Sequence, residues 1–276
     1  MNSFLKKTAA IFLTGLLFLP SGAMAAEKQS AYDRVVASGT LRCGYGVSPP
    51  NIVVDPNTGI VSGMDYDMWM EVGKELGLKI EFTEEAGWGN FIEGLKTGRY
   101  DAFCSMLWPD PARAKFLTLS RPVLFSFLDT YTRAGDTRFD GNLDRINAPD
   151  ILVPGIEGDI SSTMTQNRFP QTKIYSLPQT ATLSDLFIAV TTKKADLMFL
   201  DQAMVDHLEE NNKGALRKVE NVPHAYVFAS YFGYGVGEYQ LRDMVDLALR
   251  TMINDGRMEK IAHKYSKDYI VPTKDY

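Results

Sequence analysis

The stretch DYDMWMEVGKELGLKIEFTEEAGWGNFIEGLKTGRYDAFCSM, residues 65–106, decides the fold. Its apolar residues recur first at helical spacing and then at alternate positions, and the two patterns repeat once. The predicted elements are a helix at 65–76, a strand at 78–82, a helix at 91–98 and a strand at 100–106. A further strand begins at Thr40. Such alternation predicts a parallel sheet with helices on its faces.

A second block of the same kind follows residue 150. Its predicted elements alternate between strands and helices, at 151–154, 161 onward, 173–176, 183–191, 197–200 and 202–210. Two long apolar stretches, 122–132 and 225–235, flank this block and are typical of extended connections. Two helices, split at Gly256, follow. We therefore predict an α/β protein of two lobes, each with a mixed, mostly parallel sheet flanked by helices.

The order of these elements assigns the chain to the two lobes. Lobe 1 is predicted at 31–126 plus 231–276, because the last two helices return to it, and lobe 2 at 127–230. The two hinge strands are expected near 124–131 and 225–232. Ligands of open α/β sheets bind beyond the carboxyl ends of the strands, so two facing lobes predict a shared cleft.

The N-terminal segment has the three parts of a secretory signal peptide. Lys6 and Lys7 form a positive start, residues 8–19 are uncharged and mostly apolar, and the triplet Ala-Met-Ala that ends at Ala25 is a small-x-small cleavage pattern. The apolar run is short for a membrane span. Removal of residues 1–25 predicts a soluble protein that is exported to a bacterial periplasm.

Composition and charge exclude several classes of protein. The chain is 45% hydrophobic and 23% charged, which is not the balance of a disordered protein. Its net charge is −5 without a basic block, so nucleic acid is not predicted as a partner. The histidines, His207, His224 and His263, lack metal-ligand spacing, and no phosphate loop occurs. No metal or cofactor is predicted.

The two cysteines, Cys43 and Cys104, each lie in a short apolar run that reads as a strand. Export permits a disulfide between them. Only certain geometries allow bridging, however, and buried thiols pack well as small hydrophobic groups. Two buried free thiols are therefore the favoured prediction, and a disulfide is the alternative.

The chain also carries a series of short motifs. They are GMDYD at 63–67, LGLK at 76–79, FIEGLKTGRYD at 91–101, PARAK at 111–115, LSRP at 119–122, KAD at 194–196 and NDG at 254–256. In order and spacing they resemble the periplasmic solute-binding proteins of polar amino-acid ABC transporters, which are the bacterial extracellular solute-binding proteins, family 3. The resemblance implies the type II periplasmic binding protein fold, hinge closure on a small ligand, a membrane permease as partner, a monomer and no enzymatic activity.

The resemblance further implies roles for particular residues. Arg113 falls where the family's arginine binds the ligand α-carboxylate, for which a guanidinium offers a planar fork. Asp201 falls where an aspartate pairs with the α-ammonium. Asp101 and Asp196 are interpreted as structural residues. Apolar or cation–π walls are expected from Trp108, Tyr45 and Trp88, although a place in the core is equally open for the last two.

Other positions depart from the family pattern. Met106 and Trp108 stand where relatives offer Ser or Thr, and Asp110 replaces the usual Thr before the arginine. In lobe 2, Asp159 and Ile160 replace the residues of the usual Gly-Thr turn, and Asp159 brings a negative charge close to where an anion would bind. We predict a small ligand that carries a carboxylate and a cationic or amine group, with Met106, Asp159 and Ile160 also in contact.

The sequence leaves two other functions open. Some relatives are cyclohexadienyl dehydratases, which need a carboxylic acid in the cleft as proton donor, and Glu157 is the first candidate, with Glu84 or Glu85 behind it. Alternatively, the protein is a binding module that serves a sensor or a periplasmic dehydrogenase instead of a transporter. Its binding chemistry would then be the same.

Overall fold

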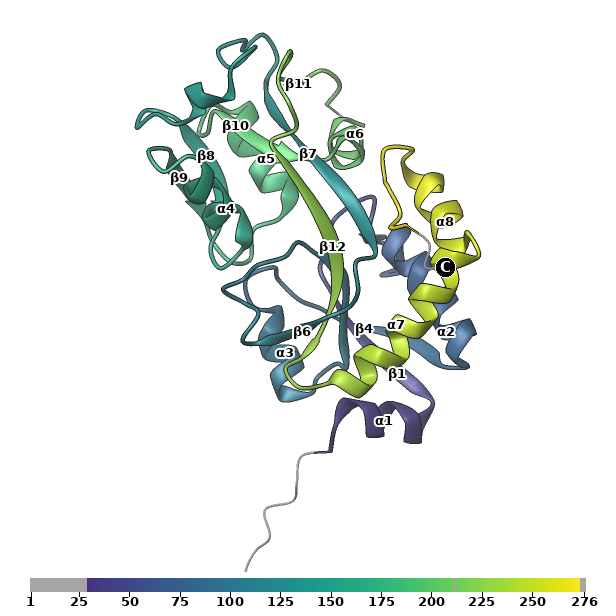
Figure 1. The fold of residues 1–276 in the computed structure, drawn as a ribbon. Coiled ribbons are helices and arrows are strands. Elements are labelled where there is room, and N and C mark those ends of the chain that lie inside the picture. The colour runs from purple at the N-terminus through teal and green to yellow at the C-terminus, as the bar shows by residue number, and fades with distance from the viewer. Residues whose placement is uncertain (1–28, 211, 274–276) are drawn as a thin grey trace, which may run out of the picture.

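Figure 1 shows a computed structural model of the chain, which describes residues 29–210 and 212–273. The predicted signal peptide, residues 1–25, lies outside the described residues. Two lobes lie one above the other in this view, and two long strands, β7 (Leu124–Arg133) and β12 (Tyr226–Gly235), run between them. The helices and strands that the sequence predicts after residue 39 all form, within a few residues of their expected bounds.

The lower lobe in Figure 1 contains the first part of the chain and its last two helices. Its elements are α1 (Ala31–Ser38), β1 (Thr40–Tyr45), β2 (Val53–Val54), β3 (Val61–Ser62), α2 (Met64–Leu76), β4 (Lys79–Glu85), α3 (Phe91–Thr97), β5 (Ala102–Leu107), β6 (Leu117–Leu119), α7 (Tyr239–Asn254) and α8 (Arg257–Tyr265). β1 pairs in parallel with both β4 and β5, as the alternating pattern predicts. β12 pairs antiparallel with β5, which makes the sheet mixed.

The upper lobe contains the second block of elements. They are a 3₁₀ helix (Leu143–Ile146), β8 (Leu152–Ile156), α4 (Ile160–Arg168), β9 (Lys173–Leu177), α5 (Leu183–Thr191), β10 (Leu197–Leu200), α6 (Gln202–Glu209) and β11 (Leu216–Lys218). β8 and β9 form a parallel pair, whereas β10 and β11 pair antiparallel with β7. The strand order β10-β7-β12-β5-β1-β4 therefore carries one sheet from the upper lobe through β7 and β12 into the lower lobe.

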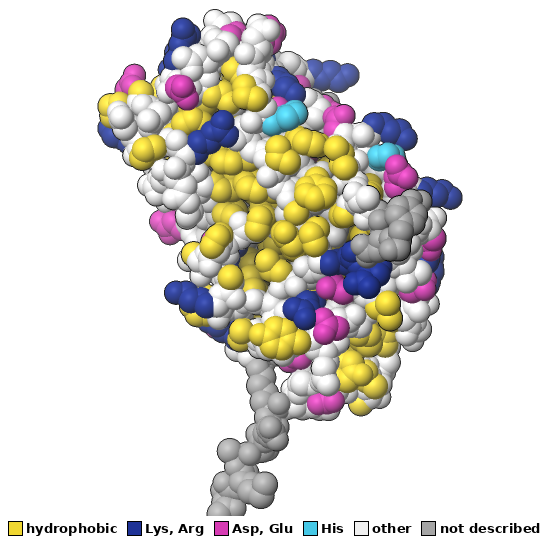
Figure 2. Space-filling model, in the orientation of Figure 1, with side chains coloured by type: hydrophobic (Ala, Val, Ile, Leu, Met, Phe, Trp, Pro, Cys, Tyr) yellow, Lys and Arg dark blue, Asp and Glu magenta, His cyan; other side chains and the backbone are white. Residues whose placement is uncertain are grey.

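β7 and β12 are the two extended connections that the sequence predicts. They pair antiparallel over residues 124–128 and 226–230. Figure 2 shows hydrophobic side chains gathered across the middle of the molecule, where these strands run in Figure 1. The hinge role of both strands, and the lobe boundaries at 126 and 231, stay predictions.

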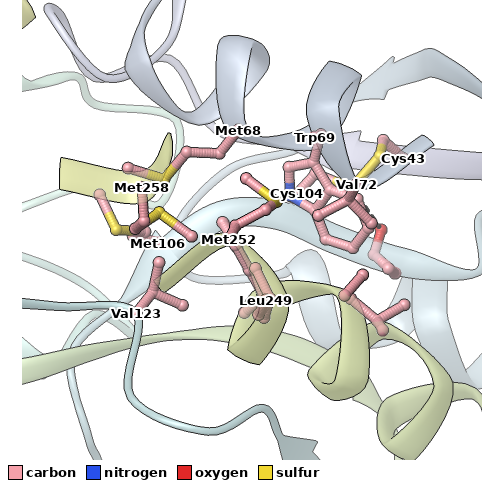
Figure 3. Close-up of a cluster of buried hydrophobic side chains, with 14 of the residues drawn as sticks. Cys43, Met68, Trp69, Val72, Cys104, Met106, Val123, Leu249, Met252 and Met258 are labelled. Atoms are coloured by element: carbon pink, nitrogen blue, oxygen red, sulfur yellow. Dashed lines mark hydrogen bonds between the residues drawn. A yellow bond between two sulfur atoms is a disulfide. The ribbon is translucent and has the colours of Figure 1, made fainter. Parts of the chain in front are cut away.

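The largest buried cluster fills the lower lobe (Figure 3). α2 contributes Met68, Trp69 and Val72, which belong to the apolar face that its helical spacing predicts, and all three are fully buried. Met252 of α7 and Met258 of α8 pack in the same cluster. Burial of one such side chain contributes about 1.5–3 kcal/mol to stability. The cluster therefore holds α7 and α8, from the far end of the chain, on the lower lobe.

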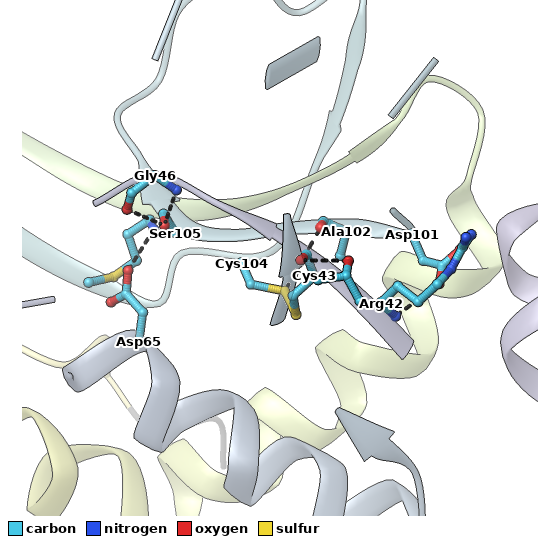
Figure 4. Close-up of a disulfide and its surroundings, with 10 residues drawn as sticks. Arg42, Cys43, Gly46, Asp65, Asp101, Ala102, Cys104 and Ser105 are labelled. Atoms are coloured by element: carbon cyan, nitrogen blue, oxygen red, sulfur yellow. Dashed lines mark hydrogen bonds and ion pairs between the residues drawn. A yellow bond between two sulfur atoms is a disulfide. The ribbon is translucent and has the colours of Figure 1, made fainter. Parts of the chain in front are cut away.

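Cys43 and Cys104 form a disulfide, which corrects the favoured prediction of two free thiols (Figure 4). The two residues lie on neighbouring parallel strands, β1 and β5, and their Cα atoms are 5.4 Å apart. That separation is within the range that a disulfide spans. The sequence placed both cysteines on strands but did not reveal that these strands are neighbours, so the bridging geometry was not visible in it.

Asp101 and Asp196 have structural partners, in agreement with the prediction. Asp101 accepts hydrogen bonds from the guanidinium groups of Arg34 and Arg42 and from the backbone amide of Arg42 (Figure 4). Asp196 accepts from a backbone amide of β8 and pairs with Arg138 at 2.6 Å. Both carboxylates hold chain segments together, and neither borders the cavity between the lobes.

A candidate binding site between the lobes

A cavity of about 100 Å³ lies between the two lobes. The lower lobe contributes Trp88, Met106, Trp108 and Arg113 to its wall. The upper lobe contributes Asp159, Ile160, Phe199 and Asp201. Ser126 of β7 and Ser230 of β12 complete the wall at the crossing strands. The structure thus brings to one cavity all the residues that the sequence placed in the site, except Tyr45.

Asp201 follows β10 directly and caps the N-terminus of α6. Its Oδ1 accepts a hydrogen bond from the backbone amide of Met204 at 2.9 Å. The residue is 5% exposed, and no Lys, Arg or His of residues 29–210 and 212–273 forms an ion pair with it. Burial raises the pKa of Asp201 to about 6, although the amide of Met204 acts in the opposite direction. A cationic group on a ligand would supply the counter-charge that the protein lacks here.

Arg113 lies in the turn after β5 and reaches the upper lobe. Its Nη2 donates to the carbonyl oxygen of Gly158 in the upper lobe and to that of Trp88, 3.2 Å away, in the lower lobe. Its Nε lies 3.4 Å from Oδ2 of Asp110, and its guanidinium carbon lies 5.2 Å from the centre of the Phe91 ring. Arg113 therefore connects the two lobes directly. Its contact with a ligand carboxylate stays a prediction.

Asp159 and Ile160 form the start of α4 on the upper wall. Oδ1 of Asp159 accepts a hydrogen bond from the backbone amide of Ile160 at 2.6 Å, so the first amide of the helix is already bonded within the chain. The Ile160 side chain is buried with Leu128 and Met164. The N-terminus of α4 thus presents a carboxylate to the cavity, where an empty helix terminus would present free amides.

Aromatic rings flank the cavity on the lower lobe. Trp108 stacks on Phe228 of β12, with ring centroids 5.8 Å apart, and Trp88 meets Phe103 of β5 edge-on at the same distance. Met106, near the end of β5, is fixed by a hydrogen bond from its backbone amide to a carboxylate oxygen of α2, at 2.8 Å. The end of β5 therefore holds Met106 in place next to Trp108 on the wall.

Tyr45 does not border the cavity, which corrects the prediction that it contacts the ligand. Its ring is buried and packs on Phe82 of β4, with centroids 5.6 Å apart. Tyr45 is the last residue of β1 and still pairs with β4, opposite Glu85. Because it ends a strand inside the sheet and not a free loop, its side chain belongs to the core, which was the other interpretation left open.

Sequence reasoning missed the hydroxyl groups at the crossing strands. Ser126 and Ser230 lie on β7 and β12 with their Oγ atoms 3.4 Å apart, and both border the cavity. Each interrupts an otherwise apolar stretch, which is a signal that could have revealed them. Asn51 was also missed, and its Oδ1 accepts a hydrogen bond from the hydroxyl group of Tyr269 at 3.2 Å. These groups add neutral polar contacts to the wall.

The glutamates considered as proton donors do not border the cavity. Glu157 is exposed and accepts a hydrogen bond from Ser176 at 3.4 Å. Glu84 pairs with Arg99 at 3.2 Å, and Glu85 is exposed. None of the three is therefore placed to protonate a ligand between the lobes.

A larger cavity, of about 380 Å³, lies between α6 and residues 266–270. Its charged side chains include Asp129, which pairs with Lys218 and has an oxygen 2.8 Å from Nδ1 of His224. Asp201, Lys267 and Asp268 also border this cavity, so it carries charges of both signs. The smaller cavity is favoured as the binding site because it gathers all the predicted site residues except Tyr45, although Asp201 borders both cavities.

The described ranges, 29–210 and 212–273, contain neither a group of side chains that could hold a metal ion nor a membrane-spanning helix. No group of three or more His, Cys, Asp or Glu residues in these ranges is placed to hold a metal ion. No helix in the same part of the chain is long and apolar enough to cross a bilayer.

The model of one protein family, the bacterial extracellular solute-binding proteins, family 3, matches residues 41–268. The chain belongs to this family. A relative in the family, the L-cystine-binding protein TcyA of Bacillus subtilis (strain 168), is 24% identical over 249 residues, which cover 87% of this chain and 86% of TcyA. Family membership confirms the resemblance predicted from the motifs and the general function of a solute-binding protein.

Solved structures of similar proteins have the same fold. The ancestral amino acid-binding protein AncCDT-1, a precursor of cyclohexadienyl dehydratase, is 25% identical with a TM-score of 0.74 and covers 87% of this chain and 100% of its own. AbpA of Streptococcus pneumoniae, solved with bound L-arginine, is 16% identical with a TM-score of 0.72. The similarity covers 86% of this chain and 98% of AbpA. These similarities confirm the predicted two-lobed, type II periplasmic binding protein fold.

Proposed function

We propose that the chain is the periplasmic substrate-binding component of an ABC importer and binds an amino acid or a related small amine between its lobes. The observation that carries the proposal is the buried carboxyl group of Asp201, which borders the interlobe cavity without a cationic partner in the described residues. The names of the relatives agree, because TcyA binds L-cystine and AbpA was solved with L-arginine.

Closure of the two lobes would couple ligand binding to transport. A ligand that contacts both lobes stabilises the closed form, which then docks on a membrane permease of the importer. The contacts of Gly158 support such closure. Its carbonyl oxygen accepts a hydrogen bond from Arg113 of the other lobe. A Cβ atom at this position would lie 3.1 Å from the Cα of Gly89, which also belongs to the other lobe. The φ of Gly158, +80°, also favours glycine. Close approach of the lobes thus depends on a residue without a side chain.

A thermal-shift screen of the mature protein against amino acids, amines, betaines and small carboxylates tests the proposal. A ligand present at 100 times its dissociation constant stabilises the protein by about 2.7 kcal/mol, which such a screen detects. Calorimetry of Asp201→Asn with each ligand found should then show an affinity lower by about 30-fold or more. The control is Asp150→Asn, an exposed acid of the upper lobe that does not border the cavity. Equal affinities of Asp201→Asn and the wild type would remove Asp201 from the site.

Closure itself is measured by small-angle X-ray scattering with and without the ligand. The radius of gyration should fall on binding, and the Asp201→Asn variant should not show this change at the same ligand concentration. Unchanged scattering at saturating ligand would contradict the hinge mechanism. Incubation with prephenate or arogenate separately tests for dehydratase activity, and we expect no aromatic product because the glutamates considered lie outside the cavity.

A further inference from the structure

Arg113 is the basic side chain of the cavity wall, yet oxygen atoms of the chain itself already engage its guanidinium. Nη2 donates to the carbonyl oxygens of Trp88 and Gly158, and Nε faces the carboxylate of Asp110 at 3.4 Å. The side chains of Arg113 and Asp110 are only 15% and 10% exposed, so water screens this pair weakly. Asp110 therefore offsets the positive charge of Arg113, which would otherwise attract a ligand carboxylate.

The N-terminus of α4 is the second place at which an anionic group of a ligand would bind. Asp159 already occupies part of it, because its own carboxylate accepts the hydrogen bond of the first helix amide at 2.6 Å. A ligand carboxylate placed here would lie next to the carboxylate of Asp159. Like charges at such short range repel strongly in a site with little water.

Asp201 differs from Arg113, because no charge in the described residues offsets its own. It is buried, its carboxylate bonds to backbone amides of α6, and no cationic side chain of the described residues pairs with it. The ionisable side chains that border the cavity or pair with a wall residue are Asp110, Asp159, Asp201 and Arg113. When all are ionised, one positive and three negative charges give this wall a net charge of 1 − 3 = −2.

Resting on the proposed function, we infer that the solute is an organic cation without a carboxylate, namely an amine or a quaternary ammonium compound with a small apolar body. Its cationic group pairs with Asp201, and its body lies against the apolar part of the wall. An amino-acid zwitterion fits less well because it has no net charge to offset the wall and adds a carboxylate close to Asp110 or Asp159.

The rest of the wall matches this class of solute. Trp88, Trp108 and Phe199 all border the cavity, and aromatic faces attract alkylammonium groups. The neutral hydroxyl groups of Ser126 and Ser230 accept hydrogen bonds from an amine without adding charge. Apolar and cation-attracting groups therefore border the same cavity as the Asp201 carboxyl group, which has no cationic partner among the described residues.

Calorimetry at pH 8 with matched pairs of solutes tests the inference. Each pair consists of an amino acid and the amine that its decarboxylation yields: arginine and agmatine, lysine and cadaverine, histidine and histamine, tyrosine and tyramine. Glycine betaine and choline form a fifth pair. In any pair of which a member binds, we expect the compound without the carboxylate to bind at least tenfold more tightly. An amino acid that binds as tightly as its amine, or more tightly, overturns the inference.

The double variant Asp110→Asn/Asp159→Asn provides the reciprocal test, because it removes two negative charges near Arg113 at constant side-chain size. The preference for the amine should fall at least tenfold, whereas the exposed control Asp150→Asn should leave it unchanged. The single variant Asp159→Asn, whose amide oxygen still caps α4, should shift the preference in the same direction if the double variant does not fold. An unchanged preference in the folded variants overturns the inference.

These outcomes separate the inference from the proposed function. If only amino acids bind, the solute class is wrong and the importer function stands. If no member of any pair binds and the thermal-shift screen finds no ligand, the proposed function fails and the inference fails with it.

Discussion

Asp101, at the outer edge of the lower lobe, and Asp201, on the wall of the interlobe cavity, are buried to nearly the same extent, at 2% and 5% exposure. Their surroundings are opposite. Asp101 accepts hydrogen bonds from two guanidinium groups, those of Arg34 and Arg42. Asp201 interacts with backbone amides of α6 and with the hydroxyl group of Tyr269, and no cation of the described residues pairs with it. One region thus neutralises its buried carboxylate within the chain, and the other provides no cation for its carboxylate among the described residues.

The pKa values of the two carboxyl groups express this difference. Burial raises the pKa of Asp101, but the hydrogen bonds from Arg42 and Arg34 outweigh it and bring the pKa below its usual value. Burial raises the pKa of Asp201 to about 6, and no cation in the described part of the chain opposes this shift. Burial alone therefore does not decide the direction of the pKa shift of these two acids, and the presence or absence of a cationic partner does.

The region around Asp101 also contains the disulfide between Cys43 and Cys104. Loss of this bond should have the largest effect that we expect. Cys43 follows Arg42, and its disulfide to Cys104 links positions 61 residues apart. Cys43→Ser/Cys104→Ser should lower the free energy of unfolding by about 4 kcal/mol, because a loop of this length is no longer closed in the unfolded chain. Urea denaturation with and without a reductant measures it. The affinity for the solute should change far less than in Asp201→Asn, and an equal loss would break the separation between the two regions.

The pH dependence of stability sharpens the comparison further. The pKa of Asp201 is about 6 in the folded protein and 3.8 in the reference state, so the folded protein binds more protons between these values. The stability of the ligand-free protein should therefore fall as pH rises from about 4 to 7, with a contribution from Asp201 of about 3 kcal/mol. Asp201→Asn should remove this part of the decline and be the more stable protein at pH 8.

Thermal denaturation of both proteins from pH 4 to 8 measures this difference. Asp65 of α2 contributes a similar decline in both, because burial raises its pKa to about 7, and it is therefore an internal reference. Parallel curves for the two proteins would show that the Asp201 carboxyl group has a counter-charge in solution, and the comparison with Asp101 would then break.

Asp101→Asn should have a smaller effect of the opposite sign, a loss of about 1–2 kcal/mol, since Arg34 and Arg42 are 28% and 31% exposed and water replaces part of their interaction. The pKa of Asp101 is lowered on folding, so its contribution is present above pH 4 and lost as the pH falls below that value. The wild type and variant should therefore converge at low pH. A lower affinity for the solute in Asp101→Asn would contradict its purely structural role.

Much of the fold could be predicted from the sequence, because local patterns decide each element. The helical spacing over α2 and the alternation of strands and helices identify both blocks without any long-range information. The pairing of strands is a long-range property, and it decided the two points that were wrong. Neighbouring positions of β1 and β5 made the disulfide possible, and continued pairing of β1 with β4 drew Tyr45 into the core.

The charged residues of the cavity were predicted from the family resemblance and from their positions in the sequence. Their ion pairs and hydrogen bonds were not predicted. The end of β10 indicated Asp201 as a cleft residue, and only the structure reveals that no cation of residues 29–210 and 212–273 pairs with it. Likewise, the sequence marked Asp110 and Asp159 as departures from the family pattern. Their contacts with Arg113 and with the first amide of α4 depend on side-chain geometry that no sequence pattern specifies.

The smallest effect we expect concerns the aromatic wall of the cavity. A test of this wall distinguishes contacts between the solute and an aromatic face from packing contacts within the fold. Trp108 borders the cavity and stacks on Phe228, so Trp108→Ala should weaken binding of an alkylammonium solute by about 0.5–2 kcal/mol, roughly two- to thirtyfold. Trp108→Phe should retain most of the affinity, because a face that attracts a cation remains, whereas Trp108→Leu keeps an apolar wall without that face. Equal affinities of the Phe and Leu variants in calorimetry would show that Trp108 contributes apolar contact alone. Asp201 would then be left as the source of selectivity for a cation.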